Sequence, residues 1–253
     1  MRLTVVGCSG SYPGPDSPAS SYLVEGEDGE RTWRVLLDLG SGALGPLHEV
    51  VDPLSIDAVF ITHLHPDHWF DMSGYYVLRK YHPSGPQPRI PVYGPRGIAK
   101  RMAKGYGLKK NPGMNEEFDF HEYDGQLPVT VGPLTLDVAR VAHPGKAYAI
   151  KVSQGESRLV YSGDTGFCDE LVELARDADL LLAEAAFREG EDNPKGLHMT
   201  GREAGETATR AGARRLVLTH IPPWYEKPAA IEEARGVFDG PLELAVCGAT
   251  YDL

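Results

Sequence analysis

The chain has 253 residues, of which 42% are hydrophobic and 24% charged, as in an ordinary soluble globular protein. Its formal net charge of −11 disfavours long-range capture of nucleic acid, because contacts to phosphate drive that binding. No apolar run reaches the length of a membrane span, and the apolar start at 1–7 is too short for a signal peptide. We therefore expect a single domain over 1–253 that lies in the cytoplasm and does not contact a membrane.

Hydrophobic patterning predicts strands that alternate with helices along the chain. Strands are expected at 1–7, 21–25, 33–38, 58–61, 90–95, 134–141, 148–152, 158–161, 179–183, 216–220 and 242–247. Helices are expected near 44–51, 71–81, 96–106, 201–211 and 229–238. This order predicts an α/β protein.

The strongest chemical signal is the sequence HLHPDH at 63–68, which directly follows a short apolar strand. Ligands of an open α/β sheet bind at the carboxyl ends of its strands. His63 and His65 are two residues apart, so in extended backbone they point the same way and can hold one ion. Asp67 and His68 follow a turn at the proline and can face a second ion. Imidazole and carboxylate are the usual ligands of zinc, and they also serve manganese or iron.

Further metal-ligating side chains recur where predicted strands end. His143, Asp164, Glu184 and His220 each stand at or just past a strand end, as His63 does. Strand tips that converge give a rigid platform for a metal pair, so we predict a dinuclear centre. One ion is held by His63, His65 and His143, the other by Asp67, His68 and His220, and Asp164 bridges both. The expected cofactors are two divalent metal ions, Zn²⁺ in the first place, with Mn²⁺ or Fe²⁺ as alternatives.

The HLHPDH sequence, followed by His143, Asp164 and His220, resembles the metallo-β-lactamase superfamily over essentially the whole chain. The resemblance implies a four-layer αββα sandwich, in which two facing mixed β-sheets are flanked by helices. It also implies a metal-dependent hydrolase in which Asp164 is the bridging ligand.

The second half of the chain is similar to the ribonuclease Z-type phosphodiesterase branch at 162–165, 184–187, 198–200 and 218–221. In that branch, the resemblance gives Asp67 the role of orienting the attacking water. It implies that His198 contacts the phosphate and assists the leaving oxygen, while Glu184 holds His198 in position. A predicted capping box at 200–203 begins a helix just after His198, and a helix N-terminus favours a bound phosphate.

Two departures from ribonuclease Z bear on the substrate. Ribonuclease Z proteins usually insert a long tRNA-gripping arm between the positions of His143 and Asp164, whereas here that interval holds little more than two strands. The net charge of −11 also suits a small substrate better than RNA. Short segments at 7–11, 15–20, 81–84 and 219–224 look like a short actinobacterial-type group described as cyclic-nucleotide phosphodiesterases. We therefore expect hydrolysis of a small cyclic phosphodiester, such as 3′,5′-cyclic AMP, by a metal-activated water.

The sequence is also compatible with other functions. The chain could be a ribonuclease Z-type endonuclease acting on the 3′ end of precursor tRNA, or a hydrolase of a lactone or thioester. A non-catalytic metal-bound module would be a different class of protein. The basic helix at 96–106 is either a solvated face or a cationic rim that helps a phosphate substrate approach. Four aromatic residues are candidates for stacking the substrate base: Tyr12, Trp69, Tyr75 and Trp224. A homodimer is expected because related enzymes are often dimers.

Overall fold

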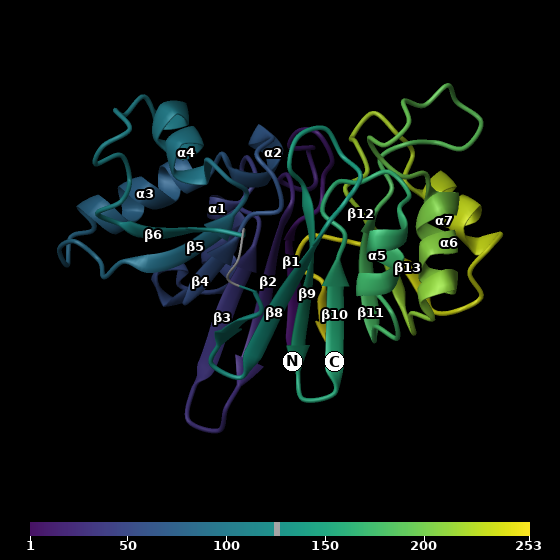
Figure 1. Ribbon diagram of the computed structural model, residues 1–253, viewed down its shortest axis with the longest axis horizontal. Coiled ribbons are helices and arrows are strands. Elements are labelled where there is room, and N and C mark those ends of the chain that lie inside the picture. Colours follow the sequence, from purple (N-terminus) through teal and green to yellow (C-terminus); the bar gives the residue numbers. More distant parts are fainter. Residues whose placement is uncertain (124–126) are drawn as a thin grey trace.

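The computed structural model describes residues 1–123 and 127–253. Two seven-stranded β-sheets face each other, and each carries helices on its outer side (Figure 1). This arrangement confirms the αββα sandwich expected from the sequence. Within the described residues, no helix is both long enough and apolar enough to cross a membrane.

The first sheet comes mainly from the N-terminal half of the chain. Its strands are β1 (Arg2–Gly7), β2 (Ser21–Glu27), β3 (Thr32–Leu37), β4 (Ala58–Phe60), β5 (Ile90–Gly94), β6 (Phe118–Glu122) and β14 (Thr250–Asp252), in the order β14-β1-β2-β3-β4-β5-β6. The hairpin β2–β3 is antiparallel, and β3 to β6 run parallel. Parallel strands end at the same edge of a sheet, so the residues that follow β3 and β4 lie close together.

The second sheet comes mainly from the C-terminal half. Its strands are β7 (Val129–Val131), β8 (Leu134–Arg140), β9 (Tyr148–Gln154), β10 (Ser157–Tyr161), β11 (Leu180–Glu184), β12 (Leu216–Thr219) and β13 (Leu242–Leu244), in the order β13-β12-β11-β10-β9-β8-β7. From β10 to β13 the strands are parallel. Their carboxyl ends therefore share one edge of the second sheet as well.

Helices form the two outer layers. They are α1 (Leu44–Val50), α2 (Pro66–Trp69), α3 (Met72–Tyr81), α4 (Ile98–Tyr106), α5 (Asp169–Leu174), α6 (Gly201–Ala211) and α7 (Pro228–Arg235), with a short 3₁₀ turn at Pro53–Ser55. In Figure 1, α1, α3 and α4 lie beside the first sheet and α5, α6 and α7 beside the second. The predicted capping box at the start of α6 is present, with Thr200 and Glu203 bonding reciprocally.

Burial on both faces of the strands explains the layered packing. In β3, Val35 and Leu37 belong to the apolar cluster between the sheets, whereas Leu36 packs in the cluster under the first helical layer. Successive strand residues point to opposite faces, so a strand covered on both sides needs an uninterrupted apolar run. In β10, Leu159 lies in the central cluster and Val160 under the second helical layer. The sandwich thus has three apolar layers, and polar side chains gather at the strand ends.

Several short elements differ from the sequence prediction. The strands β6, β7 and β14 and the helices α2 and α5 were not expected, and β13 ends at Leu244 rather than at residue 247. These elements are three to six residues long, so their own hydrophobic patterns are weak. Pairing with a neighbouring strand stabilises the short strands; β14, for example, pairs with β1 from the other end of the chain.

Candidate metal centre

The predicted site residues meet at one edge of the sandwich. His63 follows β4, His143 follows β8, Asp164 follows β10, and His220 comes directly after β12. Glu184 is the last residue of β11. The strands come from both sheets, so the site is built where the two layers face each other. Its donors therefore rest on rigid elements, as a preorganised site requires.

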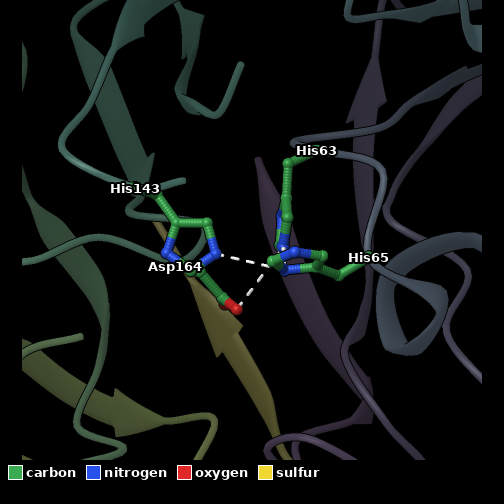
Figure 2. A group of neighbouring side chains, drawn as sticks. All are labelled: His63, His65, His143 and Asp164. Carbon is green, nitrogen blue, oxygen red and sulfur yellow. Dashed lines mark hydrogen bonds and ion pairs between the residues drawn. The ribbon is translucent and has the colours of Figure 1, made fainter. Parts of the chain in front are cut away.

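One group of donor atoms joins both halves of the chain (Figure 2). His63 Nε2 lies 3.0 Å from His65 Nδ1, and His143 Nε2 lies 3.1 Å from that same nitrogen. Asp164 Oδ2 lies 3.5 Å from His63 Nε2. All four ligand atoms lie within 4.8 Å of one another, an arrangement that one metal ion can occupy.

A second group of donor atoms shares Asp164 with the first. His68 Nε2 lies 3.1 Å from Asp164 Oδ1, and His220 Nε2 lies 3.3 Å from Asp164 Oδ2. Asp67 Oδ2 lies 3.5 Å from His68 Nε2 and 3.7 Å from His220 Nε2. The structure therefore brings all seven predicted ligands together in the two predicted sets, with the Asp164 carboxylate between them.

Hydrogen bonds on the far side of the rings orient the imidazoles. His68 donates Nδ1–H to Asp38 at 2.7 Å, and His143 donates Nδ1–H to the Leu197 carbonyl at 2.6 Å. Because each Nδ1 carries a proton to donate, the Nε2 atom of the neutral ring has a free lone pair. That nitrogen faces the donor group in both cases. Such orienting partners are typical of metal-binding histidines.

Asp38 is an important residue that the sequence reasoning missed. It follows β3 with a positive φ of 58° and is fully buried. Besides His68, its carboxylate accepts hydrogen bonds from the Thr62 backbone N–H at 2.7 Å and hydroxyl at 2.8 Å, and from the Tyr161 hydroxyl at 3.0 Å. Its place at a strand tip was a usable signal, since the other site residues share it. Ser20, whose hydroxyl lies 2.8 Å from His220 Nδ1, had no comparable signal.

Electrostatics prepare most of the imidazoles to bind a metal. Burial lowers the pKa of four of them: His63, His65, His143 and His220. The neutral form is the one that ligates a metal. Burial would also lower the pKa of His68, but the neighbouring carboxylates of Asp164, Asp67 and Asp38 outweigh it and raise that pKa. His68 must therefore give up a proton when an ion binds.

The buried polar atoms of the site fit a divalent ion. Among the described residues, His68 Nε2, His220 Nε2 and Asp164 Oδ1 are buried and have no hydrogen-bond partner. An unpaired buried polar atom is costly, and one that faces other donors is stabilised by a cation between them. The donors are imidazole nitrogens and carboxylate oxygens, which is the set that zinc, manganese and iron accept.

Beside these groups lies the pair of His198 and Glu184. His198 donates Nδ1–H to Glu184 Oε1 at 2.8 Å. The fully buried Glu184 carboxylate also accepts the backbone N–H groups of Thr165 at 2.8 Å and Ala186 at 3.1 Å, which hold it in place. Burial lowers the pKa of His198, but the Glu184 carboxylate more than offsets this effect and raises it to about 9. The imidazole therefore carries a proton close to Asp164.

Burial distinguishes among the four aromatic residues that are candidates for stacking a substrate base. Tyr75 is buried and donates its hydroxyl to the Pro53 carbonyl, and Trp69 is buried with its indole N–H on the Leu64 carbonyl. The Tyr75 ring is therefore closed to a ligand, and Trp69 is only 2% exposed. Tyr12 and Trp224 are 43% and 59% exposed.

The basic helix α4 borders a groove of about 520 Å³. Its cationic lining residues are Arg96, Lys100, Arg101 and Lys104. Leu64 and Trp69 from the histidine-rich segment line the same groove. The cations therefore stand next to the segment that carries four of the predicted metal ligands, which favours the cationic rim over a merely solvated face.

The fold and the site define the class of metal-dependent hydrolases built on an αββα sandwich. Residues 33–221 match a family model described as "Beta-lactamase superfamily domain", and the chain belongs to that superfamily.

Known relatives place the chain in the ribonuclease Z-like branch. A probable metallo-hydrolase of Bacillus subtilis, YhfI, is 30% identical over 260 residues, and the alignment covers 100% of both chains. The crystal structure of YhfI superimposes with a TM-score of 0.86 at 28% identity, covering 99% of both chains. A ribonuclease Z of Geobacillus kaustophilus is 31% identical over 314 residues, covering 100% of this chain and 99% of the relative. The uncharacterized protein Rv1339 of Mycobacterium tuberculosis is 42% identical over 257 residues, covering 100% of this chain and 92% of the relative.

Proposed function

We propose that the protein is a phosphodiesterase that hydrolyses a small cyclic phosphodiester, such as 3′,5′-cyclic AMP. One observation carries this proposal: the His198–Glu184 pair, with a bond of 2.8 Å, lies against the two donor groups that share Asp164. A hydrolase that cleaves a P–O bond needs an activated water on one side and a proton donor for the leaving oxygen on the other. The arrangement offers residues for both tasks.

The ligand assignment is part of the proposal. His63, His65 and His143 hold one divalent ion, Asp67, His68 and His220 hold a second, and Asp164 bridges them; Zn²⁺ is the expected metal, and Mn²⁺ or Fe²⁺ are the alternatives. The two groups of converging donor atoms and their unpaired buried atoms support this assignment. When bound, such ions supply Lewis acidity and make water a stronger nucleophile at neutral pH.

The chain's own residues complete the reaction. Asp67 turns one carboxylate oxygen toward His68 and His220, and its other oxygen can accept a hydrogen bond from the attacking water and orient it. His198 holds a proton on Nε2, since Glu184 occupies Nδ1. That Nε2 proton passes to the departing ribose oxygen as the P–O bond breaks. Glu184 remains a carboxylate and stabilises the imidazolium throughout.

The shortness of the segment between His143 and Asp164 supports the proposal of a small substrate. This interval consists of the hairpin β9–β10 and short connections. The alignment with the ribonuclease Z of Geobacillus kaustophilus spans 314 positions against the 253 residues of this chain, so the relative carries inserted segments that this chain lacks. The net charge of −11 also disfavours a large polyanion.

RNA cleavage is the second candidate function, with precursor tRNA as the substrate. The cationic groove beside α4 favours it, because phosphates of a longer substrate could lie along Lys100 and Lys104 while another phosphate reacts. The ribonuclease Z relatives are consistent with this alternative.

A turnover panel separates the candidates. The protein is supplied with Zn²⁺, Mn²⁺ or Fe²⁺ in turn, its metal content is measured, and each sample is given cyclic nucleotides, linear phosphodiesters, precursor tRNA, and a lactone and a thioester. We expect two metal ions per chain and the highest kcat/KM with a cyclic nucleotide. Faster cleavage of precursor tRNA at matched concentration would establish the second candidate instead. Turnover of the lactone or thioester alone would refute both.

We further propose that residues 1–253 act as one catalytic domain, that the protein works in the cytoplasm, and that it forms a homodimer. The central apolar cluster, which combines residues of both sheets, supports a single domain. Light scattering of the purified protein tests the dimer, and a monomeric mass would contradict it.

A further inference from the structure

An exposed aromatic pair remains outside the proposed reaction. Tyr12 and Trp224 come from opposite ends of the chain, yet their ring centroids lie 5.3 Å apart at an interplanar angle of 32°. Tyr12 is 43% exposed and Trp224 59%. Burial of an aromatic ring against a ligand is favourable, so two adjacent exposed rings offer a surface on which a flat apolar group can bind.

The pair stands beside the metal-binding edge. Trp224 follows His220 by four residues in the same loop. Tyr12 follows Gly10 by two residues, and Gly10 packs so tightly that an added Cβ would lie 3.0 Å from Cδ2 of the His220 ring. With consecutive Cα atoms about 3.8 Å apart, the Tyr12 Cα lies within roughly 8 Å of the Gly10 Cα. Both aromatic residues therefore stand in loops that contact each other at His220 and Ile221.

The backbone holds the two loops together. The Gly10 N–H donates to the Ile221 carbonyl at 3.2 Å, and the Tyr12 N–H donates to the Gly10 carbonyl at 2.7 Å. An added Cβ at Gly14 would lie 3.0 Å from the Pro223 ring, so the loops also touch beyond the aromatic residues. Proline restricts the backbone of both loops. The rings are thus presented on a firm support, which lowers the entropic cost of binding.

We propose that the Tyr12–Trp224 pair is a stacking platform for the nucleobase of the substrate. This inference rests on the proposed function, because it assigns the base-binding part of a nucleotide whose phosphate reacts at the metal centre. The exposed face of Trp224 stacks on the base, and Tyr12 supports the indole from its other side. Stacking on an aromatic ring needs only the planar face of a base. The platform therefore accepts adenine and guanine alike and binds the larger purines more tightly than pyrimidines.

Binding of adenosine to the full chain tests the platform separately from catalysis. Adenosine has a base and a ribose but no phosphate, so it cannot be hydrolysed as a phosphodiester. Isothermal titration calorimetry compares the unaltered protein with Trp224→Ala, Trp224→Phe and Tyr12→Ala. The matched control is Tyr81→Ala, which removes a 65% exposed ring from α3. Circular dichroism verifies that each variant is folded.

We expect saturable binding of adenosine that weakens about 5- to 150-fold in Trp224→Ala. Trp224→Phe should recover part of the affinity, Tyr12→Ala should lose less than Trp224→Ala, and Tyr81→Ala should bind as the unaltered protein does. Absence of adenosine binding, or equal binding by Trp224→Ala, would overturn the proposal. A change from dimer to monomer in Trp224→Ala with unchanged adenosine binding would also overturn it, since the pair would then contact a second copy.

Failure of the proposed function gives a different pattern. If the unaltered protein binds adenosine through Trp224 but hydrolyses no cyclic nucleotide, the platform stands and the cyclic-phosphodiesterase assignment falls. If it hydrolyses cyclic nucleotides with a KM that Trp224→Ala leaves unchanged, the function stands and the platform falls.

Discussion

His68 donates its Nδ1–H to the Asp38 carboxylate at 2.7 Å, and both side chains are fully buried. Asp38 also accepts the Thr62 N–H and hydroxyl, so one carboxylate orients the imidazole and ties the histidine-rich segment to the end of β3. The position of His68 thus depends on a residue that belongs to neither group of proposed ligands.

Replacement of Asp38 by Asn should weaken metal binding by about 10- to 100-fold. The amide keeps the shape of the carboxylate but loses its charge, so it no longer holds His68 as firmly. The measurement is a metal titration against a competing chelator. Asp252→Asn serves as control, since this exposed carboxylate pairs with Arg2 near the chain ends. Equal metal affinity in Asp38→Asn and the unaltered protein would contradict the orienting role.

Asp164→Ala should lose bound metal and hydrolytic activity together. The variant removes the carboxylate that lies between both donor groups, at 3.5 Å from His63 in the first group and 3.1 Å from His68 in the second. Elemental analysis and turnover are measured on the same sample, with Asp169→Ala on α5 as control. An Asp164→Ala protein that retains two ions would show that the bridging assignment is wrong.

His198→Ala should keep its metal and lose about 10²- to 10⁴-fold in turnover. The imidazole bonds to Glu184 rather than to the two main donor groups, so its loss removes a proton donor while the proposed ligands stay. His82→Ala, in the loop after α3, is the matched control. Parallel loss of metal in His198→Ala would instead make His198 a ligand.

Chelation of the metal should lower the melting temperature by about 10 °C. An ion bound at about 1,000 times its Kd contributes about 4 kcal/mol, and in a chain of this size each kcal/mol shifts Tm by about 2–4 °C. Without the ion, the buried Nε2 atoms of His68 and His220 and the Oδ1 atom of Asp164 have no hydrogen-bond partner among the described residues. Differential scanning calorimetry with and without chelator measures the shift. An unchanged Tm, with metal loss verified, would indicate that the ions do not stabilise the fold.

The β2–β3 turn gives a pH prediction away from the metal centre. Hydrogen bonds from the Arg31 backbone and the Trp33 indole lower the pKa of Asp28 to about 2. Because the folded pKa lies below the ordinary value of 3.8, the contribution of the Asp28 carboxylate to folding stability is complete above pH 3.8. It is lost as the pH falls through about 2. NMR titration of the Asp28 carboxyl group measures the midpoint, and a midpoint near 3.8 would show that these bonds do not persist in solution.

Much of the fold follows from local pattern. The apolar run before His63 predicts β4, and the Thr200–Glu203 capping box predicts the start of α6 at Gly201, as found. The sequence also singles out the proposed ligands, since imidazoles and carboxylates at successive strand ends have few other uses. These predictions depend on neighbours in the sequence or on the chemistry of each residue alone.

Only the tertiary structure decided which distant groups support the site. Asp38 meets His68 across 30 residues, Ser20 meets His220 across 200, and the Leu197 carbonyl meets His143 across 54. The sequence also did not determine which aromatic side chains are exposed: Trp69 is buried, whereas Trp224 is exposed. The physical reason is that hydrogen-bond partners and burial depend on how the two sheets pack together. Sequence spacing describes contacts within an element, whereas packing joins residues with no fixed separation along the chain.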